Sequence, residues 1–187
     1  MKVIVGLGNP EPRYSGTRHN IGYSMVFQFA TNQGGVFKQH PKFKALISEL
    51  TLGDTKVLVV MPTTYYNLVG ESVRAIIDFY KLSPQAVLIV HDELMLPVGT
   101  LRTRVGGSDA GNNGIKSVSQ HIGEDTSRLR VGIGSEQREQ MDDADFVLSK
   151  FNAAERAALA NLQHIAEGCI EDFIYGDFTS TTHKSAS

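Results

Sequence analysis

The 187-residue chain has a single cysteine, Cys169, and no apolar run of the length that crosses a membrane as a helix. One cysteine excludes an internal disulfide framework and zinc clusters that use cysteine ligands. Met1 and Lys2 lead only to a short apolar run before Gly6, too short for the core of a secretory signal. These absences predict a soluble, cytoplasmic protein without a membrane partner.

Excess positive charge is also absent, because the formal net charge at pH 7 is −2. The chain as a whole therefore lacks the basic character of many nucleic-acid-binding proteins. Charge is nevertheless uneven, since residues 1–44 carry six Lys or Arg against one acidic residue, and residues 136–178 carry ten Asp or Glu against three Lys or Arg. This asymmetry allows a local positive face, although an ordinary solvated surface is the simpler explanation.

Short β-rich runs alternate with segments of helical periodicity, which predicts one layered α/β domain over residues 1–178. The expected strands are 2–6, 45–51, 56–61, 87–91, 99–105 and 128–133, and the expected helices are 20–32, 68–80, 113–122 and 153–175. Residues 179–187 are polar, so we expect a frayed C-terminal tail.

Apolar patterns predict where some of these elements lie. Residues 87–90 (VLIV) are apolar on both faces, which is typical of a central strand covered on both sides. Residues 128–133 (RLRVGI) alternate instead, which indicates a face nearer to solvent or an edge position. Cys169 falls on the apolar face of the last helix and is most simply a small core residue.

The first expected strand ends in a glycine-rich turn, residues 6–9 (GLGN), which is similar to the start of a dinucleotide-binding loop. The third glycine of that fingerprint is replaced by Glu11, whose carboxylate would repel phosphate. Pro10 and Pro12 remove two backbone N–H donors from the same segment. A dinucleotide-dependent oxidoreductase is therefore a weak alternative.

Polar side chains gather where expected strands end and helices begin. They are Asn9, His19, Asn67, His91, Asp92, Asn112 and Asn113. Each has an ordinary explanation, because Asn before a helix is usually an N-cap, Asp at a strand end often forms a turn, and a lone His is often on the surface. His91 and Asp92 are adjacent on a strand, so at most one of them faces a given pocket. Together, the set predicts an active site at one edge of an open α/β sheet.

These side chains suit hydrolysis by activated water. A histidine acts as a general base near neutral pH when a carboxylate fixes its tautomer and stabilises the imidazolium. No G-x-S-x-G elbow supplies a serine nucleophile, and asparagine amides can hold a peptide and a developing oxyanion. The residues predict a metal-free esterase or amidase and leave its substrate open.

Four motifs resemble, in order and spacing, those of the bacterial-type peptidyl-tRNA hydrolase family. They are GLGNPEPRYSGTRHNIG, MPTTYYNLVG, VHDELMLPVGTLRTRVGGSDAGNNGIKSV and RLRVGIG, and they extend over almost the whole chain. The resemblance implies a monomeric, single-domain α/β protein with a mixed, mostly parallel twisted sheet flanked by helices. It also implies hydrolysis of the ester between the peptide and the terminal ribose of peptidyl-tRNA, without a cofactor, which recycles tRNA dropped from ribosomes.

The resemblance further implies roles for individual residues. His19 matches the general base of the family, and Asp92 matches the residue that orients it. Asn9 matches the asparagine that helps to distinguish peptidyl from free aminoacyl substrates. Asn67 and Asn113 match the substrate-binding asparagines of the family. Tyr14 and Tyr65 match its aromatic positions that contact the tRNA end.

The sequence departs from the family pattern at Glu11, Tyr66, Val69 and Asn112, where the family usually has Gly, Met, Ser and His. None of these changes removes a residue with a direct catalytic role, so we expect them to affect peptide binding more than chemistry. A non-catalytic RNA-binding relative of the same fold is the main alternative. It predicts loss of His19 or Asp92, and both are present.

Basic residues beside the expected site are candidates for contact with the tRNA backbone. Arg102 and Arg104 are two apart on an expected strand and so project from one face. Lys116 falls in the first turn of the helix that Asn113 opens, and Arg130 is a further candidate. Taken alone, this pattern is better explained as a strand with a solvated basic face, but a tRNA substrate requires positive groups that meet its phosphates.

Overall fold

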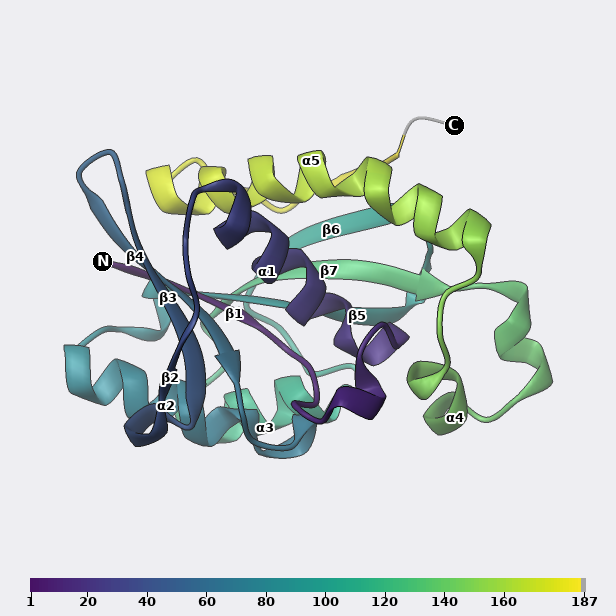
Figure 1. Cartoon of the computed structure of the whole chain (residues 1–187), viewed down its shortest axis with the longest axis horizontal. Helices are drawn as coiled ribbons and strands as arrows, with labels where there is room; N and C mark the ends of the chain where they lie inside the picture. The colour runs from purple at the N-terminus through teal and green to yellow at the C-terminus, as the bar shows by residue number, and fades with distance from the viewer. Residues whose placement is uncertain (186–187) are drawn as a thin grey trace.

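The computed structural model describes residues 1–185, which form one eight-stranded sheet between two layers of helices (Figure 1). The strand order is β2-β3-β4-β1-β5-β7-β6-β8. The strands are β1 Lys2–Gly6, β2 Lys38–His40, β3 Ala45–Leu52, β4 Thr55–Pro62, β5 Val87–Pro97, β6 Thr100–Val105, β7 Ser127–Gly134 and β8 Thr182–Lys184. The α-helices are α1 Ile21–Asn32, α2 Val69–Tyr80, α3 Asn113–Ile122, α4 Asp143–Leu148 and α5 Ala153–Tyr175.

Apolar side chains of the sheet pack against helices on both of its faces. Helices α1 and α5 cover one face, and α2 and α3 cover the other (Figure 1). Alternation along β1 sends Ile4 toward α1 and α5, and Val3 and Val5 toward α2 and α3. On β5, Leu88 likewise faces α1 and α5, and Ile89 faces α2 and α3. All five side chains are fully buried. The central strands therefore have no solvated face, which explains why their sequences are continuously apolar.

The sheet is mixed, as predicted, with a parallel centre and antiparallel edges. Strands β4, β1, β5 and β7 are parallel to one another, whereas β2, β3, β6 and β8 are joined to the sheet by antiparallel pairings. Three of the seven pairings are parallel, so the expectation of a mostly parallel sheet holds only for the centre.

Strand β7 lies between β5 and β6, and its alternation arises because Leu129 and Val131 face the α1 and α5 core while Arg128 and Arg130 face the other way. The predicted edge position for residues 128–133 is therefore wrong, because β7 has a neighbouring strand on each side.

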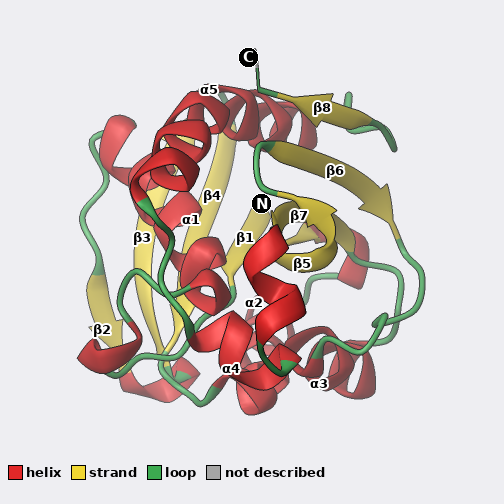
Figure 2. Cartoon of the chain, turned by 90° about the vertical axis from the view of Figure 1, so that its right-hand side faces the viewer, coloured by secondary structure: helices red, strands yellow, loops and turns green. Residues whose placement is uncertain are grey.

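The four predicted helices are confirmed to within one residue at each end. Strand β5 differs from its prediction, because it continues to Pro97 with an irregular register after Glu93, so His91 and Asp92 lie within the strand. The prediction of a frayed tail is wrong for Thr182–Lys184, because these residues form strand β8 and pair with β6 (Figure 2). Residues 186 and 187 lie outside the described part of the chain.

The glycines of the N-terminal turn serve helix packing. A Cβ atom on Gly22 of α1 would lie 2.3 Å from the Val90 carbonyl oxygen and 2.7 Å from the Leu7 nitrogen. A Cβ atom on Gly6 would lie 2.5 Å from the Gly22 carbonyl oxygen. The two glycines let α1 approach the ends of β1 and β5 closely enough that the Tyr23 N–H donates to the Leu7 carbonyl at 3.2 Å. This contact explains Gly6 without a bound nucleotide.

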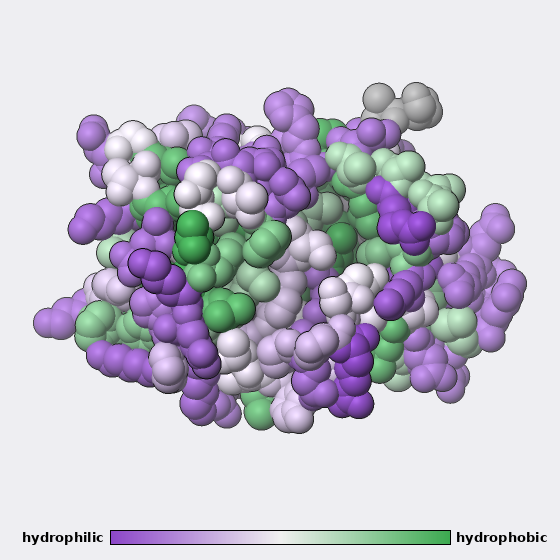
Figure 3. Space-filling model, viewed as in Figure 1, coloured by the Kyte–Doolittle hydropathy of each residue, from purple (hydrophilic) through white to green (hydrophobic). Residues whose placement is uncertain are grey.

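The surface seen in Figure 3 is mainly hydrophilic along its outline, with hydrophobic residues toward the middle of that face. Within residues 1–185, no helix combines the length and apolar character needed to cross a membrane.

Candidate active site

A cavity of about 570 Å³ opens beside the carboxyl-terminal parts of β1 and β5. Its lining includes all seven residues that the resemblance matched to catalytic or substrate-binding roles, namely Asn9, Tyr14, His19, Tyr65, Asn67, Asp92 and Asn113. They come from the loop after β1, the turns before α1 and α2, strand β5 and the start of α3, so the fold collects them from distant parts of the chain. His91 lines a separate, small cavity, which confirms that it faces away from Asp92.

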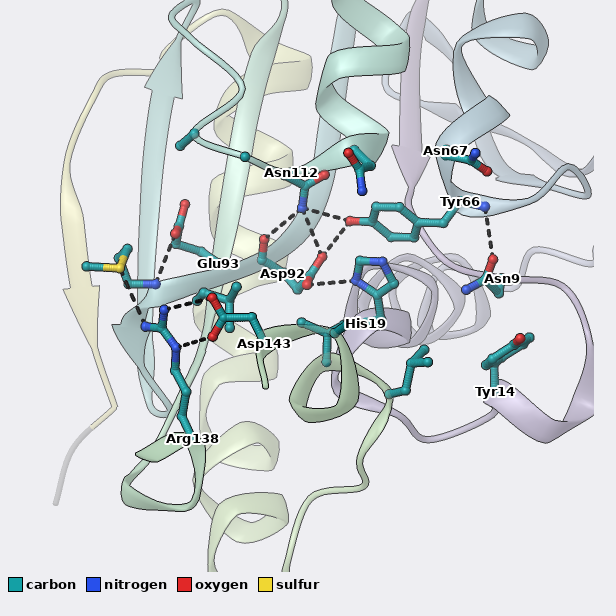
Figure 4. Close-up of a pocket in the computed structure, with 18 of the residues that line it drawn as sticks. Asn9, Tyr14, His19, Tyr66, Asn67, Asp92, Glu93, Asn112, Arg138 and Asp143 are labelled. Atoms are coloured by element: carbon teal, nitrogen blue, oxygen red, sulfur yellow. Dashed lines mark hydrogen bonds and ion pairs between the residues drawn. The ribbon is translucent and has the colours of Figure 1, made fainter. Parts of the chain in front are cut away.

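The centre of the cavity is a contact between His19 and Asp92 (Figure 4). The Nδ1 atom of His19 lies 2.9 Å from Oδ2 of Asp92. Because an ionised carboxylate can only accept, Nδ1 carries the proton and Nε2 is the basic nitrogen. His19 is partly accessible, with 17% of its side chain exposed, whereas Asp92 is 3% exposed. This is the arrangement in which a carboxylate fixes the tautomer of a general base.

Asp92 is charged although it is buried. Burial alone would raise its pKa, but the charge of His19 and the hydrogen bonds from His19 and Tyr66 outweigh that effect and lower it. Its neighbour His91 is also buried, and burial lowers the pKa of His91 to about 4. The Nδ1–H of His91 donates to the Asp92 backbone carbonyl at 2.7 Å. Neutral His91 therefore supports the strand on which Asp92 stands.

Asn9 is fixed by three hydrogen bonds, made with two residues, that the sequence did not reveal. Its backbone N–H donates to Oδ1 of Asn20 at 2.9 Å, and the Asn20 amide returns a bond to the Asn9 carbonyl at 2.8 Å. Its own Oδ1 accepts from the Tyr66 backbone N–H at 2.9 Å. The side-chain oxygen of Asn9 is thus occupied, and its Nδ2 amide is the donor that it can offer to a ligand.

Asn112 is the N-cap of α3, because its Oδ1 accepts from the Ile115 backbone N–H at 3.0 Å. Asn113 is the first residue of the helix and does not cap it, and the N-cap of α2 is Leu68 in place of Asn67. The ordinary N-cap explanation is therefore wrong for both Asn67 and Asn113. Both are exposed and line the cavity, where their amides are free to meet a ligand.

A family model described as peptidyl-tRNA hydrolase matches residues 3–187. The chain belongs to the peptidyl-tRNA hydrolase family. The peptidyl-tRNA hydrolase of Ligilactobacillus salivarius is 42% identical over 186 residues, which cover 98% of this chain and 99% of that protein. The peptidyl-tRNA hydrolase of Maricaulis maris is 39% identical over 190 residues, which cover 99% of this chain and 94% of that protein. The crystal structure of Acinetobacter baumannii peptidyl-tRNA hydrolase has a TM-score of 0.87 at 35% identity, covering 94% of this chain and 89% of that one.

The cavity of this family member also has apolar lining residues. They include Leu94 and Met95 of β5 and Val147 and Leu148 of α4. Met95 is 74% exposed and Leu148 is 42% exposed, so both are accessible to a ligand. Arg138 and Asp143 complete the lining and form an ion pair at 2.7 Å (Figure 4). One cavity thus offers both polar and apolar surface to a ligand.

The basic residues expected to face tRNA do not line this cavity. Arg102 and Arg104 of β6 are exposed and pair in register with Arg130 and Arg128 of β7, so all four share one face. Arg130 is held by Glu93, with Nη2 at 2.5 Å from Oε2, and Arg102 donates to the Thr182 hydroxyl.

Arg128 was not singled out from the sequence, yet it is a buried member of this face. It is 3% exposed and donates to the Ser108 carbonyl at 2.6 Å, while its Nε and Nη2 have no partner within residues 1–185. Arg104 and Arg128 line the same small cavity, and Lys116 is exposed on α3. Within residues 1–185, Arg104 and Arg128 have no ion-pair partner, whereas Arg130 is paired with Glu93.

Two departures from the family pattern have local explanations. Glu11 precedes a short 3₁₀ turn and pairs with Arg13 at 2.8 Å, so its charge is partly neutralised. Val69, the first residue of α2, is fully buried in the core beneath that helix. The other two departures, Tyr66 and Asn112, lie at the centre of the site.

Proposed function

We propose that the protein hydrolyses the ester between the peptide and the terminal ribose of peptidyl-tRNA, using water activated by His19 without a metal ion. The observation that carries this proposal is the His19–Asp92 pair in the cavity of a peptidyl-tRNA hydrolase family member. We expect the protein to act as a monomer in the cytoplasm.

The proposed reaction begins at Nε2 of His19, which takes a proton from a water molecule. The water oxygen attacks the ester carbonyl carbon, and Asp92 stabilises the imidazolium that forms. When the tetrahedral intermediate collapses, the C–O bond to the ribose breaks and the imidazolium returns its proton to the ribose oxygen. The products are a free tRNA hydroxyl and a peptide carboxylic acid, which loses its proton to solvent, and the base is regenerated.

The asparagines are proposed to hold the peptide and the developing oxyanion. The Nδ2 amide of Asn9 and the amides of Asn67 and Asn113 are donors at the cavity. A peptidyl ester carries an amide next to the scissile group, which a free aminoacyl ester lacks. Tyr14 and Tyr65 are proposed to contact the tRNA end, because aromatic rings stack on unpaired bases.

The direct test is incubation with a labelled N-blocked aminoacyl-tRNA, with release of the blocked amino acid followed over time. Release is expected, and it should persist in the presence of EDTA. A protein that binds the tRNA without cleaving it would be the non-catalytic RNA-binding relative. Loss of activity in EDTA with recovery on adding Zn²⁺ would contradict the metal-free mechanism.

Replacing Asn67 or Asn113 with alanine is expected to lower kcat/KM by about 3–10-fold, the size of one lost hydrogen bond to a substrate. The Tm should stay close to that of the parent protein, because neither side chain caps a helix. Steady-state kinetics and thermal melting on the same samples check this. Normal kinetics with a loss of about 1 kcal/mol in stability would instead indicate a structural role.

Replacing Arg104 with alanine is expected to weaken binding to all tRNAs alike and to reduce the salt slope of binding by about one unit. Recognition through backbone and shape makes the effect independent of tRNA sequence. Hydrolysis of a minimal substrate without the tRNA body should barely change. Arg74→Ala is the matched control, because Arg74 is an exposed arginine of α2 that pairs with Asp78. Equal damage to minimal and full-length substrates would indicate that Arg104 supports the fold instead.

A further inference from the structure

Tyr66 touches both members of the proposed catalytic pair. Its hydroxyl donates to Oδ1 of Asp92 at 2.5 Å, and its ring stacks on the ring of His19 with 3.5 Å between centroids. The side chain is buried, and a Cβ atom on Gly114 would come within 2.5 Å of its ring. Burial and the charge of Asp92 raise the pKa of Tyr66 well above its ordinary value, so the hydroxyl stays a donor.

Asn112 reaches the same carboxylate oxygen from α3. Its Nδ2 lies 2.9 Å from the Tyr66 hydroxyl and 3.2 Å from Oδ1 of Asp92 (Figure 4). Its Oδ1 is engaged as the N-cap of α3, which fixes the orientation of the amide. Tyr66 and Asn112 thus bring two donors to Oδ1, while Oδ2 accepts from His19.

We propose that Tyr66 and Asn112 are positioning residues for the hydrolysis, which hold Asp92 with Oδ2 toward His19 and set the pH at which activity rises. This inference rests on the proposed function of the site. Donors at Oδ1 draw negative charge away from Oδ2, so the carboxylate stabilises the imidazolium less strongly. Each donor also supports the other, because Asn112 bonds to the Tyr66 hydroxyl as well as to Asp92.

The other charged and titratable groups around the pair are few. His91 and Glu93 are neighbours of Asp92 on β5, and Glu93 is held by Arg130. Across the cavity, Arg138 and Asp143 form their own ion pair, and Tyr14 and Tyr65 complete the titratable lining. Within the part of the chain that the structure describes, only His19, Tyr66 and Asn112 make side-chain hydrogen bonds to the carboxylate oxygens of Asp92.

The test compares Tyr66→Phe, Asn112→Ser and the double variant. Phenylalanine keeps the ring on His19, and serine keeps a good N-cap for α3. Each single variant leaves one donor at Oδ1, so we expect only small upward shifts in the acidic limb of the kcat–pH profile. The double variant should shift the limb upward by about one pH unit, which exceeds the sum of the single shifts. Its plateau kcat should fall several-fold, with KM changed less than kcat.

The direction of the shift follows from two effects of the same sign. Without donors, Asp92 holds the imidazolium proton to higher pH, and the lowered pKa of Asp92 itself rises. Asp92→Asn should move the limb the opposite way, because a neutral amide stabilises the imidazolium less. Tyr23→Phe is the matched control, since Tyr23 is a partly buried tyrosine whose hydroxyl donates to the Pro62 carbonyl outside this network.

The proposal would be overturned if the acidic limb of the double variant lay at the same pH as that of the parent protein while its Tm fell. Tyr66 and Asn112 would then have only a structural role. A downward shift would overturn it as well. The proposed function is tested separately, by hydrolysis with the parent protein and its loss in His19→Ala. If the parent protein does not hydrolyse the substrate, the proposed function itself fails.

Discussion

Replacing His19 with alanine is expected to slow hydrolysis of N-blocked aminoacyl-tRNA by about 10²–10⁴-fold, the usual contribution of a general base. The reason is that His19 is partly accessible in the cavity with its basic Nε2 available, while Asp92 holds Nδ1. The binding residues are untouched, so affinity for tRNA should be nearly unchanged. Single-turnover rates and a separate binding titration measure the two quantities.

The variant should also fold, because other contacts hold the turn that carries His19. The backbone N–H of Arg18 donates to the Ser149 carbonyl at 2.9 Å, and that of Asn20 to the Thr17 carbonyl at 3.1 Å. His40→Ala is a suitable control, since His40 lies on edge strand β2 away from the cavity. Near-full activity of His19→Ala would rule out His19 as the base.

Replacing Arg18 with methionine is expected to destabilise the protein by about 3–5 kcal/mol, the cost of leaving a buried ion pair with one partner. Arg18 is fully buried, and its Nη2 lies 3.0 and 2.9 Å from the two carboxylate oxygens of Glu155. Its guanidinium also lies over the rings of Phe146 and Phe151. For a protein of this size the loss corresponds to a fall in Tm of about 6–20 °C.

The double variant Arg18→Met/Glu155→Gln should recover much of this stability. Glutamine removes the unpaired charge and can still accept from the Asn152 backbone N–H, as Glu155 does in its capping box. An exposed pair gives the contrasting case, because Arg74→Ala at the surface pair with Asp78 should cost at most about 1 kcal/mol. Denaturant unfolding of the four proteins checks the order. A cost for Arg18→Met as small as that for Arg74→Ala would contradict the assignment.

Much of the fold could be predicted because the signals were local. The run at 87–90 is apolar on both faces and lies at the centre of the sheet. The capping-box residues Asn152 and Glu155 predict the start of the helix at 153–175, and both capping hydrogen bonds are present in the structure. Short edge elements gave no such signal, since β8 is three polar or charged residues that pair only with β6.

Within the site, the sequence indicated which residues gather but not how they bond. Asn9, His19 and Asp92 could be expected at one edge of the sheet because parallel strands end there. Tyr66 was visible only as a departure from a family pattern, because its partners Asp92 and Asn112 are 26 and 46 residues away. Arg18 looked like an ordinary basic residue, since its burial depends on residues 115 to 137 positions further along the chain.

The distance in sequence between Arg18 and Glu155 has a consequence for the order in which a ribosome completes the enzyme. His19 emerges early and Asp92 follows, but the turn beside His19 receives its buried counter-ion only when the start of α5 has been made. The surroundings of the proposed catalytic pair are therefore completed late in synthesis. Under the proposed activity, a copy interrupted before residue 155 is attached to tRNA by the bond that the enzyme cleaves. Such a copy lacks Glu155, the buried partner of Arg18, so we expect its release to depend on complete copies of the enzyme.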